Sequence, residues 1–306
     1  MDKHTGRIVG YDDAKIGTRV FHGQWSSPSL GRVGNRDLVF FGGGDGICYA
    51  FEALKNVSQK PVTLNRVWSC DCNPPEYRLR DGKPIDYWSG NARTSDANKD
   101  DGQFVGPSEI IATPVFYKNR VYVAIGQDPT HGRGRGMLTC IDATKTGDIS
   151  KTGKIWTFDR LDRTLSTVSI ADGLLYIADL PGNLYCLDAE TGQCYWAHDT
   201  QQQVWGSTLV ADGKIYLGTQ KALWVFTAGK KKHVLGQIHL GSPIWSTPVA
   251  ADGALYVASQ RYLWATEPSE RRNSRAVATT PAPPHTLDAS RPIVPVRQSL
   301  PGKRQT

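Results

Sequence analysis

Residues 166–177 read Ser-Thr-Val-Ser-Ile-Ala-Asp-Gly-Leu-Leu-Tyr-Ile, and a closely related pattern returns twice further along the chain. Its centre, Ala-Asp-Gly, occurs at residues 171–173, 211–213 and 251–253, always forty residues apart. Asp and Gly tolerate the positive φ values that a tight turn between antiparallel strands requires. Each copy therefore predicts a β-hairpin, and the constant spacing predicts a repeated structural unit.

Each copy continues into a second hairpin. In the clearest copy, the apolar run at residues 183–187 leads through a turn at residues 188–192 into a further run at residues 193–196. Two hairpins place four short strands in about forty residues, which is the length of one β-propeller blade. One blade cannot bury both faces of its sheet, so neighbouring copies must stack. The pattern predicts an all-β fold, a propeller of four-stranded antiparallel blades.

Two further copies, lengthened by insertions, open at Trp25-Ser26-Ser27-Pro28 and at Ile111-Ala112-Thr113-Pro114. We therefore expect a propeller over residues 1–266, with blades near residues 25–69, 111–157, 165–197, 205–240 and 245–266 plus 1–10. The last range joins both ends because Asp2-x-x-Thr5-Gly6 matches the turn that leads into an outermost strand, which would complete the last blade and close the ring. The alternative is an incomplete ring with further blades upstream.

Residues 267–306 differ in character from the rest of the chain. The periodicity stops there, and seven of the eighteen Pro residues lie in this segment. We predict a disordered, basic, Pro-rich tail. Its seven Arg and Lys residues against three acidic ones supply +4 of the formal net charge of +7, which leaves +3 for the propeller. So small a charge argues against a nucleic-acid-binding surface.

The clearest turn carries the pattern Asp188-x-x-Thr191-Gly192-x-x-x-Trp196. This pattern resembles the tryptophan-docking motif of PQQ-like (pyrroloquinoline-quinone-like) propeller repeats, and the resemblance covers residues 1–266. It implies that the Trp packs between adjacent blades, that Thr and Gly shape the turn, and that the Asp tethers it. Three residues of partial copies stand at equivalent positions: Asp142, Trp156 and Trp68.

The family has two functional classes. Quinoprotein dehydrogenases hold PQQ and Ca²⁺ over the propeller centre, whereas members such as the lipoprotein of the outer-membrane β-barrel assembly machinery bind no quinone. The dehydrogenases carry an adjacent Cys-Cys disulfide, and this chain has no adjacent Cys pair and no Cys-x-x-Cys-His haem motif. The resemblance therefore implies a non-catalytic scaffold that binds a protein or peptide and holds no cofactor. The alternative is a PQQ- and calcium-dependent alcohol or sugar dehydrogenase, or its cofactor-binding remnant.

The expected location rests on the same resemblance, which implies the periplasm or cell envelope of a bacterium. The chain as given has no apolar signal region at its start. It also has no stretch that approaches the roughly 20 apolar residues of a membrane span. The resemblance thus implies association with the envelope, and the sequence predicts no membrane span.

Two insertions, at residues 71–108 and 127–136, mark a candidate binding face. In an up-and-down blade, the loop between the second and third strands opens on the same face as the connection to the next blade, so the two insertions should meet. Long loops on a rigid scaffold often carry binding residues, although solvated decoration is the alternative. Their aromatic and guanidinium groups suit a carboxylate, a phosphate or an extended peptide. These residues are Tyr77, Arg78, Arg80, Tyr87, Trp88, Arg93, Arg133 and Arg135.

Three tryptophans, Trp25, Trp205 and Trp245, each stand just before an innermost strand. By the repeat geometry they should ring the mouth of the central channel. Aromatic rings at such a place either stack on a flat ligand or grip a peptide, or they plug the channel.

The cysteines do not form a metal-binding pattern. Cys70-x-Cys72 has no second Cys pair or nearby His that would complete a tetrahedral zinc site. Cys194 lies across a hairpin from Cys186, and the sequence does not decide whether these two cysteines form a disulfide. We predict no metal site and propose no catalytic residue.

Overall fold

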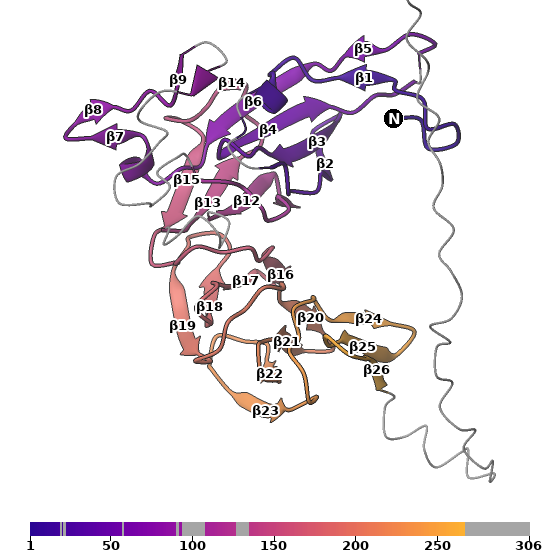
Figure 1. Ribbon diagram of the computed structural model, residues 1–306, viewed down its shortest axis with the longest axis vertical. Coiled ribbons are helices and arrows are strands. Elements are labelled where there is room, and N and C mark those ends of the chain that lie inside the picture. Colours follow the sequence, from indigo (N-terminus) through magenta and orange to yellow (C-terminus); the bar gives the residue numbers. More distant parts are fainter. Residues whose placement is uncertain are drawn as a thin grey trace, which may run out of the picture. The chain divides into compact units, whose positions relative to one another are not determined.

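The computed structural model describes residues 1–18, 20, 23–56, 58–89, 92–93, 108–126 and 135–266. Its regular structure consists of β-strands and two short 3-10 helices, η1 (Ile16–Thr18) and η2 (Pro75–Tyr77), within these ranges (Figure 1). The predicted all-β fold of antiparallel propeller blades is confirmed. The predicted disordered tail, residues 267–306, lies outside the described residues.

Five blades follow one another along the described chain, and the strands within each blade are antiparallel to their neighbours; β14 (Gly147–Asp148) adds a parallel edge strand to the sheet of blade 1. Blade 1 contains β2 (Ser29–Val33), β3 (Arg36–Gly42), β4 (Ile47–Glu52) and β6 (Arg66–Asp71). Blade 2 contains β11 (Val115–Tyr117), β12 (Arg120–Ile125), β13 (Met137–Asp142) and β15 (Lys154–Phe158). Blade 3 contains β16 (Ser169–Ala171), β17 (Leu174–Ala178), β18 (Asn183–Asp188) and β19 (Cys194–Asp199). Blade 4 contains β20 (Leu209–Ala211), β21 (Lys214–Gly218), β22 (Leu223–Thr227) and β23 (Val234–Ile238). Blade 5 contains β24 (Val249–Ala251), β25 (Ala254–Ala258) and β26 (Leu263–Thr266).

The Ala-Asp-Gly triplets form the hairpin turns of the last three blades. Asp172 and Gly173 have φ values of +51° and +76°, and the other two Asp-Gly pairs have similar values. Positive φ at both central residues is the geometry of a type I′ turn, whose twist matches that of the flanking strands. The local sequence therefore determines where each hairpin reverses.

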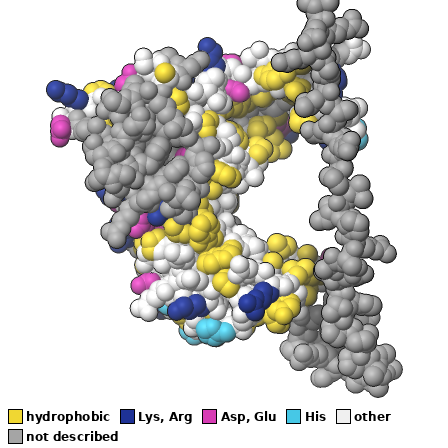
Figure 2. Space-filling view, in the orientation of Figure 1, with side chains coloured by type: hydrophobic (Ala, Val, Ile, Leu, Met, Phe, Trp, Pro, Cys, Tyr) yellow, Lys and Arg dark blue, Asp and Glu magenta, His cyan; other side chains and the backbone are white. Residues whose placement is uncertain are grey.

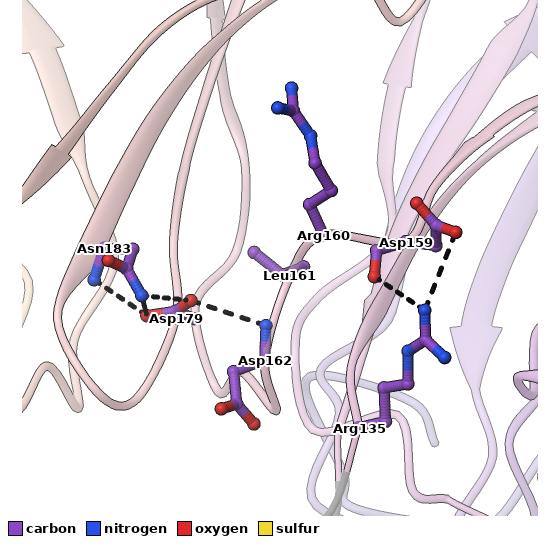
Figure 3. Close-up of a pocket in the computed structure, with 7 residues that line it drawn as sticks. All are labelled: Arg135, Asp159, Arg160, Leu161, Asp162, Asp179 and Asn183. Atoms are coloured by element: carbon purple, nitrogen blue, oxygen red, sulfur yellow. Dashed lines mark hydrogen bonds and ion pairs between the residues drawn. The ribbon is translucent and has the colours of Figure 1, made fainter.

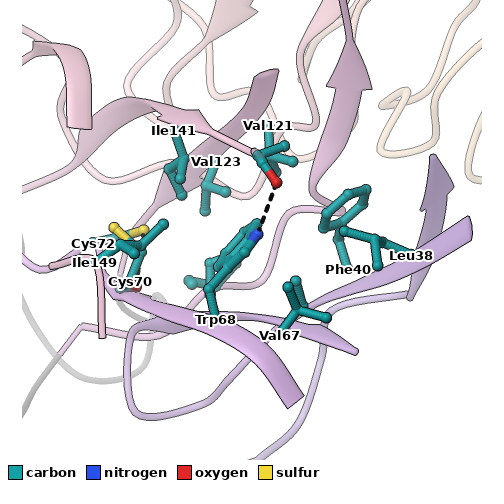
Figure 4. Packing of buried hydrophobic residues seen from close by; sticks show 14 of the residues in the cluster. Leu38, Phe40, Val67, Trp68, Cys70, Cys72, Val121, Val123, Ile141 and Ile149 are labelled. Atoms are coloured by element: carbon teal, nitrogen blue, oxygen red, sulfur yellow. Dashed lines mark hydrogen bonds between the residues drawn. The ribbon is translucent and has the colours of Figure 1, made fainter. Parts of the chain in front are cut away.

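Consecutive blades pack face to face through buried side chains. Trp68 of blade 1 is fully buried with Phe40 of its own sheet and with Val123 of blade 2 (Figure 4). Corresponding clusters join blade 2 to 3, blade 3 to 4 and blade 4 to 5. The core of the protein is therefore a series of interfaces between sheets.

The Asp-Thr-Gly turn of one blade receives the Trp of the blade before it. The Asp188 carboxylate accepts hydrogen bonds from the N–H groups of Glu190 and Thr191, at 2.9 and 3.0 Å. Trp196 Nε1 donates to the carbonyl of Gly229 in blade 4 at 2.9 Å. In the same way, Trp68 Nε1 of blade 1 donates to the carbonyl of Ala143 in blade 2 at 3.3 Å. Each of these two Trp residues thus ties its blade to the following one.

Residues 2–7 form the same turn as residues 188–193. The N–H of Asp2 donates to the carbonyl of Arg7 at 2.8 Å, as the N–H of Asp188 does to Gln193. The strand after the turn, β1 (Gly10–Tyr11), pairs in parallel with β5 (Val62–Thr63) of blade 1. Backbone hydrogen bonds to Val62 and Leu64 hold this segment beside blade 1. The pairing of residues 1–10 with blade 5 stays a prediction.

Candidate functional site

The loops between second and third strands and the connections between blades form one face, which we call the loop face. In a four-stranded antiparallel sheet, the second and fourth strands run in the same direction, so both kinds of loop leave the same edge. They are also hydrogen-bonded to one another: Leu180 N–H donates to the Arg163 carbonyl at 2.9 Å, and Gln220 N–H donates to the Gln203 carbonyl at 2.9 Å. The loop face is therefore a connected backbone surface.

The two insertions meet on the loop face. The N–H of Arg135, at the end of the second insertion, donates to the hydroxyl of Tyr77 in η2 at 2.6 Å. The Arg135 guanidinium lies 3.2 Å from a carboxylate oxygen of Glu76. Both side chains of this ion pair are about half exposed, so it contributes little to stability. The ion pair instead fixes the position of the first insertion, because it joins that insertion to blade 2.

Three of the predicted ligand-binding side chains are used inside the chain. Tyr77 and Tyr87 are 9% and 2% exposed, and the Tyr87 hydroxyl donates to the Tyr77 carbonyl at 2.8 Å. Arg78 Nε lies 2.6 Å from a carboxylate oxygen of Asp71, and its Nη2 donates to the Asp45 carbonyl at 3.0 Å. These side chains hold the first insertion against blade 1.

The remaining predicted residues of the insertions are only partly described. Trp88 begins β9 (Trp88–Ser89) and is half-buried. Arg80 ends β7 (Leu79–Arg80), which pairs with β8 (Lys83–Pro84), and Arg93 ends β10 (Ala92–Arg93), which pairs with β9. The side chains of Arg80 and Arg93, and the whole of Arg133, lie outside the described part of the chain.

A pocket of about 470 Å³ opens on the loop face between blades 2 and 3 (Figure 3). Its charged groups are of both signs, with two guanidinium groups and three carboxylates. Arg135 reaches across one side, where Nη2 lies 3.3 Å from the carbonyl and 3.6 Å from a carboxylate oxygen of Asp159. The lining residues are Arg135, Asp159, Arg160, Leu161, Asp162, Asp179 and Asn183.

Asp179, at the base of this pocket, is fully buried. It accepts hydrogen bonds from the backbone N–H groups of Asn183 at 2.8 Å and Gly182 at 3.1 Å. Burial raises the pKa of the Asp179 carboxyl, and the hydrogen bonds from Asn183 oppose the rise. The carboxylate therefore holds the shape of its own loop, and most of its acceptor capacity is occupied.

Asp45 has the same role in blade 1. It accepts from the N–H of Ile47 at 3.1 Å and from the Tyr49 hydroxyl at 2.7 Å, and burial raises the pKa of its carboxyl. Sequence reasoning missed the role of both carboxylates. A sequence pattern that could have identified them is an Asp that lies a few residues before a Tyr in the third strand of a blade, as in Asp45-x-x-x-Tyr49.

Two of the three predicted channel tryptophans lie together. The Trp205 and Trp245 rings are 6.0 Å apart in an edge-to-face arrangement, and Trp205 is 42% exposed. Trp25 is 52% exposed and lies over the backbone of Gly23, where a Cβ would come within 2.8 Å of its indole. The structure thus presents a pair of accessible indoles at the start of blades 4 and 5.

All six cysteines are free thiols. In the β18–β19 register Cys186 is opposite Trp196 and Leu187 is opposite Cys194, so the two cysteines are not direct cross-strand partners. No group of three or more His, Cys, Asp or Glu side chains in the described ranges is placed to hold a metal ion. Nor does the described structure contain a helix that is long and apolar enough to span a membrane.

The chain is similar to a known protein family and to several solved β-propeller structures. The family described as outer membrane protein assembly factor BamB matches residues 134–235. The structure of BamB from Moraxella catarrhalis is similar with a TM-score of 0.54 and 14% identity, over 85% of this chain and 60% of that chain. Quinohemoprotein alcohol dehydrogenase ADHIIG from Pseudomonas putida HK5 has a TM-score of 0.39 and 17% identity, over 48% of this chain and 28% of that one. The C-terminal WD40 domain of Sif2 has a TM-score of 0.47 and 13% identity, over 74% and 54%. No curated protein sequence matches the chain.

The chain is a β-propeller that resembles BamB in fold, and its residues 134–235 match the BamB family. It spans about 60% of the length of the BamB chain that it matches. At 14% identity the structural similarity shows the shared fold.

Proposed function

We propose that this protein is a non-catalytic propeller scaffold of the bacterial cell envelope that presents its loop face to a protein or an extended peptide. The envelope location and the type of partner are supported by the similarity of repeat and fold to an outer membrane protein assembly factor. The chemistry of the loop face supports a polypeptide ligand independently.

The main support for the proposal is the Trp205–Trp245 pair, in which Trp205 is exposed and Trp245 is half-buried. Both rings stand on residues that precede an innermost strand, and the N–H of Ser207 donates to the Thr247 hydroxyl at 2.8 Å, which joins the two strand starts. Aromatic rings held on a rigid backbone offer a large contact area at little cost in side-chain entropy. A peptide side chain or a flat apolar group fits such a pair.

The pocket between blades 2 and 3 favours a polypeptide over a small anion. Arg135 and Arg160 are matched by the carboxylates of Asp159, Asp162 and Asp179, so the pocket has no excess of positive charge for a phosphate. A polypeptide carries groups of both signs together with backbone donors and acceptors, and it complements a mixed surface of this kind.

A selection from random displayed peptides on the immobilised full chain tests the proposal. Peptides enriched on the wild type are expected to lose affinity by about tenfold or more, equivalent to about 1.4 kcal/mol, for the double variant Trp205→Ala/Trp245→Ala. Lys214→Ala is the control, because Lys214 follows an Ala-Asp-Gly turn at the opposite ends of the strands. Failure to enrich any peptide, or equal binding to wild type and double variant, would contradict the proposal.

The dehydrogenase alternative is tested by thermal unfolding, followed by Trp fluorescence, with and without PQQ and Ca²⁺. We expect the same midpoint in both conditions. A ligand that binds only the folded state stabilises it by about 2.7 kcal/mol at a hundredfold excess over its Kd. A clear rise of the midpoint would therefore overturn the scaffold proposal in favour of a quinoprotein.

A further inference from the structure

Blades 4 and 5 carry the same group of side chains on the loop face, forty residues apart. Trp205 and Trp245 each precede an innermost strand, and Lys221 and Arg261 each follow a Gln between the second and third strands. Trp205, Lys221 and Arg261 are exposed, and Trp245 is half-buried. We call these four residues the Trp–cation surface. Blade 4 packs against blades 3 and 5, so its half of the surface does not lie at an end of the described chain.

The fold does not require this group of side chains. In blade 3 the N–H of Leu180 donates to the Arg163 carbonyl at 2.9 Å, and the corresponding hydrogen bonds in blades 4 and 5 are 2.9 and 2.7 Å long. Blade 3 nevertheless has Pro181 where the later blades have a cation, and Leu165 where they have a Trp. Because the same backbone forms without either residue, the Trp and the cation are available for contacts with a ligand.

The loop that carries Lys221 is bonded to the segments of both tryptophans. The Lys221 N–H donates to the side-chain oxygen of Gln202 at 3.2 Å, three residues before the Trp of blade 4. The N–H of Ile244, the residue before the Trp of blade 5, donates to the carbonyl of Thr219 in the same loop at 3.0 Å. The ammonium group of Lys221 therefore extends from a backbone that is fixed beside the two indoles.

Arg261 is attached in the same way, and both cations lack a partner charge. The N–H of Gln260 donates to the Pro243 carbonyl at 2.7 Å, two residues before the Trp of blade 5. Neither Arg261 nor Lys221 forms an ion pair within the described residues. The guanidinium of Arg135, in contrast, lies between carboxylates of the chain itself.

The loop-face segments of blades 4 and 5 contain no Asp or Glu. These segments are residues 200–208, 219–222, 239–248 and 259–262. The adjacent Asp199 ends β19, and its carboxylate accepts a hydrogen bond from the N–H of Gln201 at 2.7 Å. Figure 2 shows Lys or Arg side chains beside hydrophobic ones over the last strands. Positive charge is therefore unbalanced here, whereas the pocket between blades 2 and 3 holds both signs.

We infer that the peptide bound at the Trp–cation surface is acidic and carries an apolar side chain. This inference rests on the proposed function and names the class of peptide. The apolar side chain packs on the Trp205 and Trp245 rings, which are 6.0 Å apart. Carboxylates of the peptide pair with Lys221 and Arg261. Each exposed ion pair adds little affinity, but the unbalanced charge speeds encounter with an acidic segment and disfavours a basic one.

The same selection from random displayed peptides gives the first test. Among peptides that enrich on the wild type and are lost on Trp205→Ala/Trp245→Ala, acidic residues should exceed basic ones by about twofold or more relative to the starting library. A parallel selection on Lys221→Glu/Arg261→Glu should lose or reverse this excess. Trp-dependent peptides without an acidic excess would overturn this inference and leave the proposed function standing. No enrichment at all would overturn both.

The second test measures the association rate of one enriched acidic peptide at low and high salt. Lys221→Glu/Arg261→Glu should slow association by about tenfold at low salt, and the difference should shrink as salt screens the charges. Lys145→Glu/Lys231→Glu is the matched control, because it changes the net charge equally. Both control residues are exposed in turns between third and fourth strands, on the opposite face.

The control variant should associate at the wild-type rate. Equal slowing in the two double variants would show that the net charge of the chain, and not the Trp–cation surface, attracts the peptide, which would overturn the inference. Unfolding midpoints equal to that of the wild type would establish that both variants fold.

Discussion

Gly192 of blade 3 lies directly against the indole of Trp156 in blade 2: a Cβ on residue 192 would come within 2.7 Å of Cδ2. Gly192 also has a φ of +76°. Two separate constraints, the left-handed backbone and the close approach of the ring, thus act on a single residue of the tryptophan-docking motif.

Gly192→Ala should lower the free energy of unfolding by about 2–4 kcal/mol, because it combines backbone strain with a steric clash. Gly173→Ala is the matched control, since Gly173 has the same φ of +76° and no atom within 4 Å of its ideal Cβ. That variant should cost only about 1 kcal/mol. Urea titration measures both, and equal losses would show that the approach of Trp156 is not a constraint.

Trp196→Ala should be among the most destabilising single substitutions, at about 3–5 kcal/mol. The indole packs on Phe226 at 6.0 Å and donates to the Gly229 carbonyl, so its removal opens the interface between blades 3 and 4. Trp205→Ala serves as the comparison, because its exposed ring should cost less than about 1 kcal/mol. Denaturant midpoints that fall by the same amount in both variants would contradict this assignment.

His198 should make stability depend on pH. Its ring lies edge-on to Trp224 at 4.9 Å, and its buried Nε2 makes no hydrogen bond within the described structure. Burial lowers the pKa of His198 below its ordinary value of 6.5, and the positive charge of Lys232 lowers it further.

Because the unfolded chain binds this proton more readily, the contribution of His198 is complete above about pH 6.5 and is lost as the pH falls through the lower folded-state pKa. His198→Gln should remove this part of the pH dependence. The difference in unfolding free energy between wild type and variant is measured from pH 8 down to pH 5. A difference that does not change with pH would contradict the assignment.

Thiol labelling should separate one cysteine from the other five. Cys194 is half-buried, whereas the other cysteines are buried. Burial raises the pKa of Cys140 to about 11 and that of Cys186 to about 12, which suppresses the reactive thiolate. Titration of the native protein with a disulfide reagent near pH 8 should detect about one rapid thiol, lost in Cys194→Ser.

After unfolding in denaturant without reductant, the same titration should detect all six thiols. A count lower by two would show that a disulfide forms in the protein as purified.

The burial of side chains in the insertions could not be predicted from the sequence. Tyr77 and Tyr87 have the composition of a ligand-binding surface, yet they are buried because the first insertion folds back on blade 1 and meets Arg135. The sequence analysis did not identify Asp179. Its carboxylate is buried because it accepts hydrogen bonds from the N–H of Asn183 in its own loop and from the N–H of Asp162 in the preceding connection. Both results depend on contacts between segments that no local pattern links.

The sequence by itself determined the blades. Asp172-Gly173 and its two repeats favour positive φ within a few residues of chain, and the forty-residue period requires the resulting sheets to stack. Only the tertiary structure decided which segment lies beside β1, because residues 2–7 form the same turn whichever blade they join. That choice depends on pairing with β5 over fifty residues away and on apolar surfaces that are complete only when whole blades are assembled.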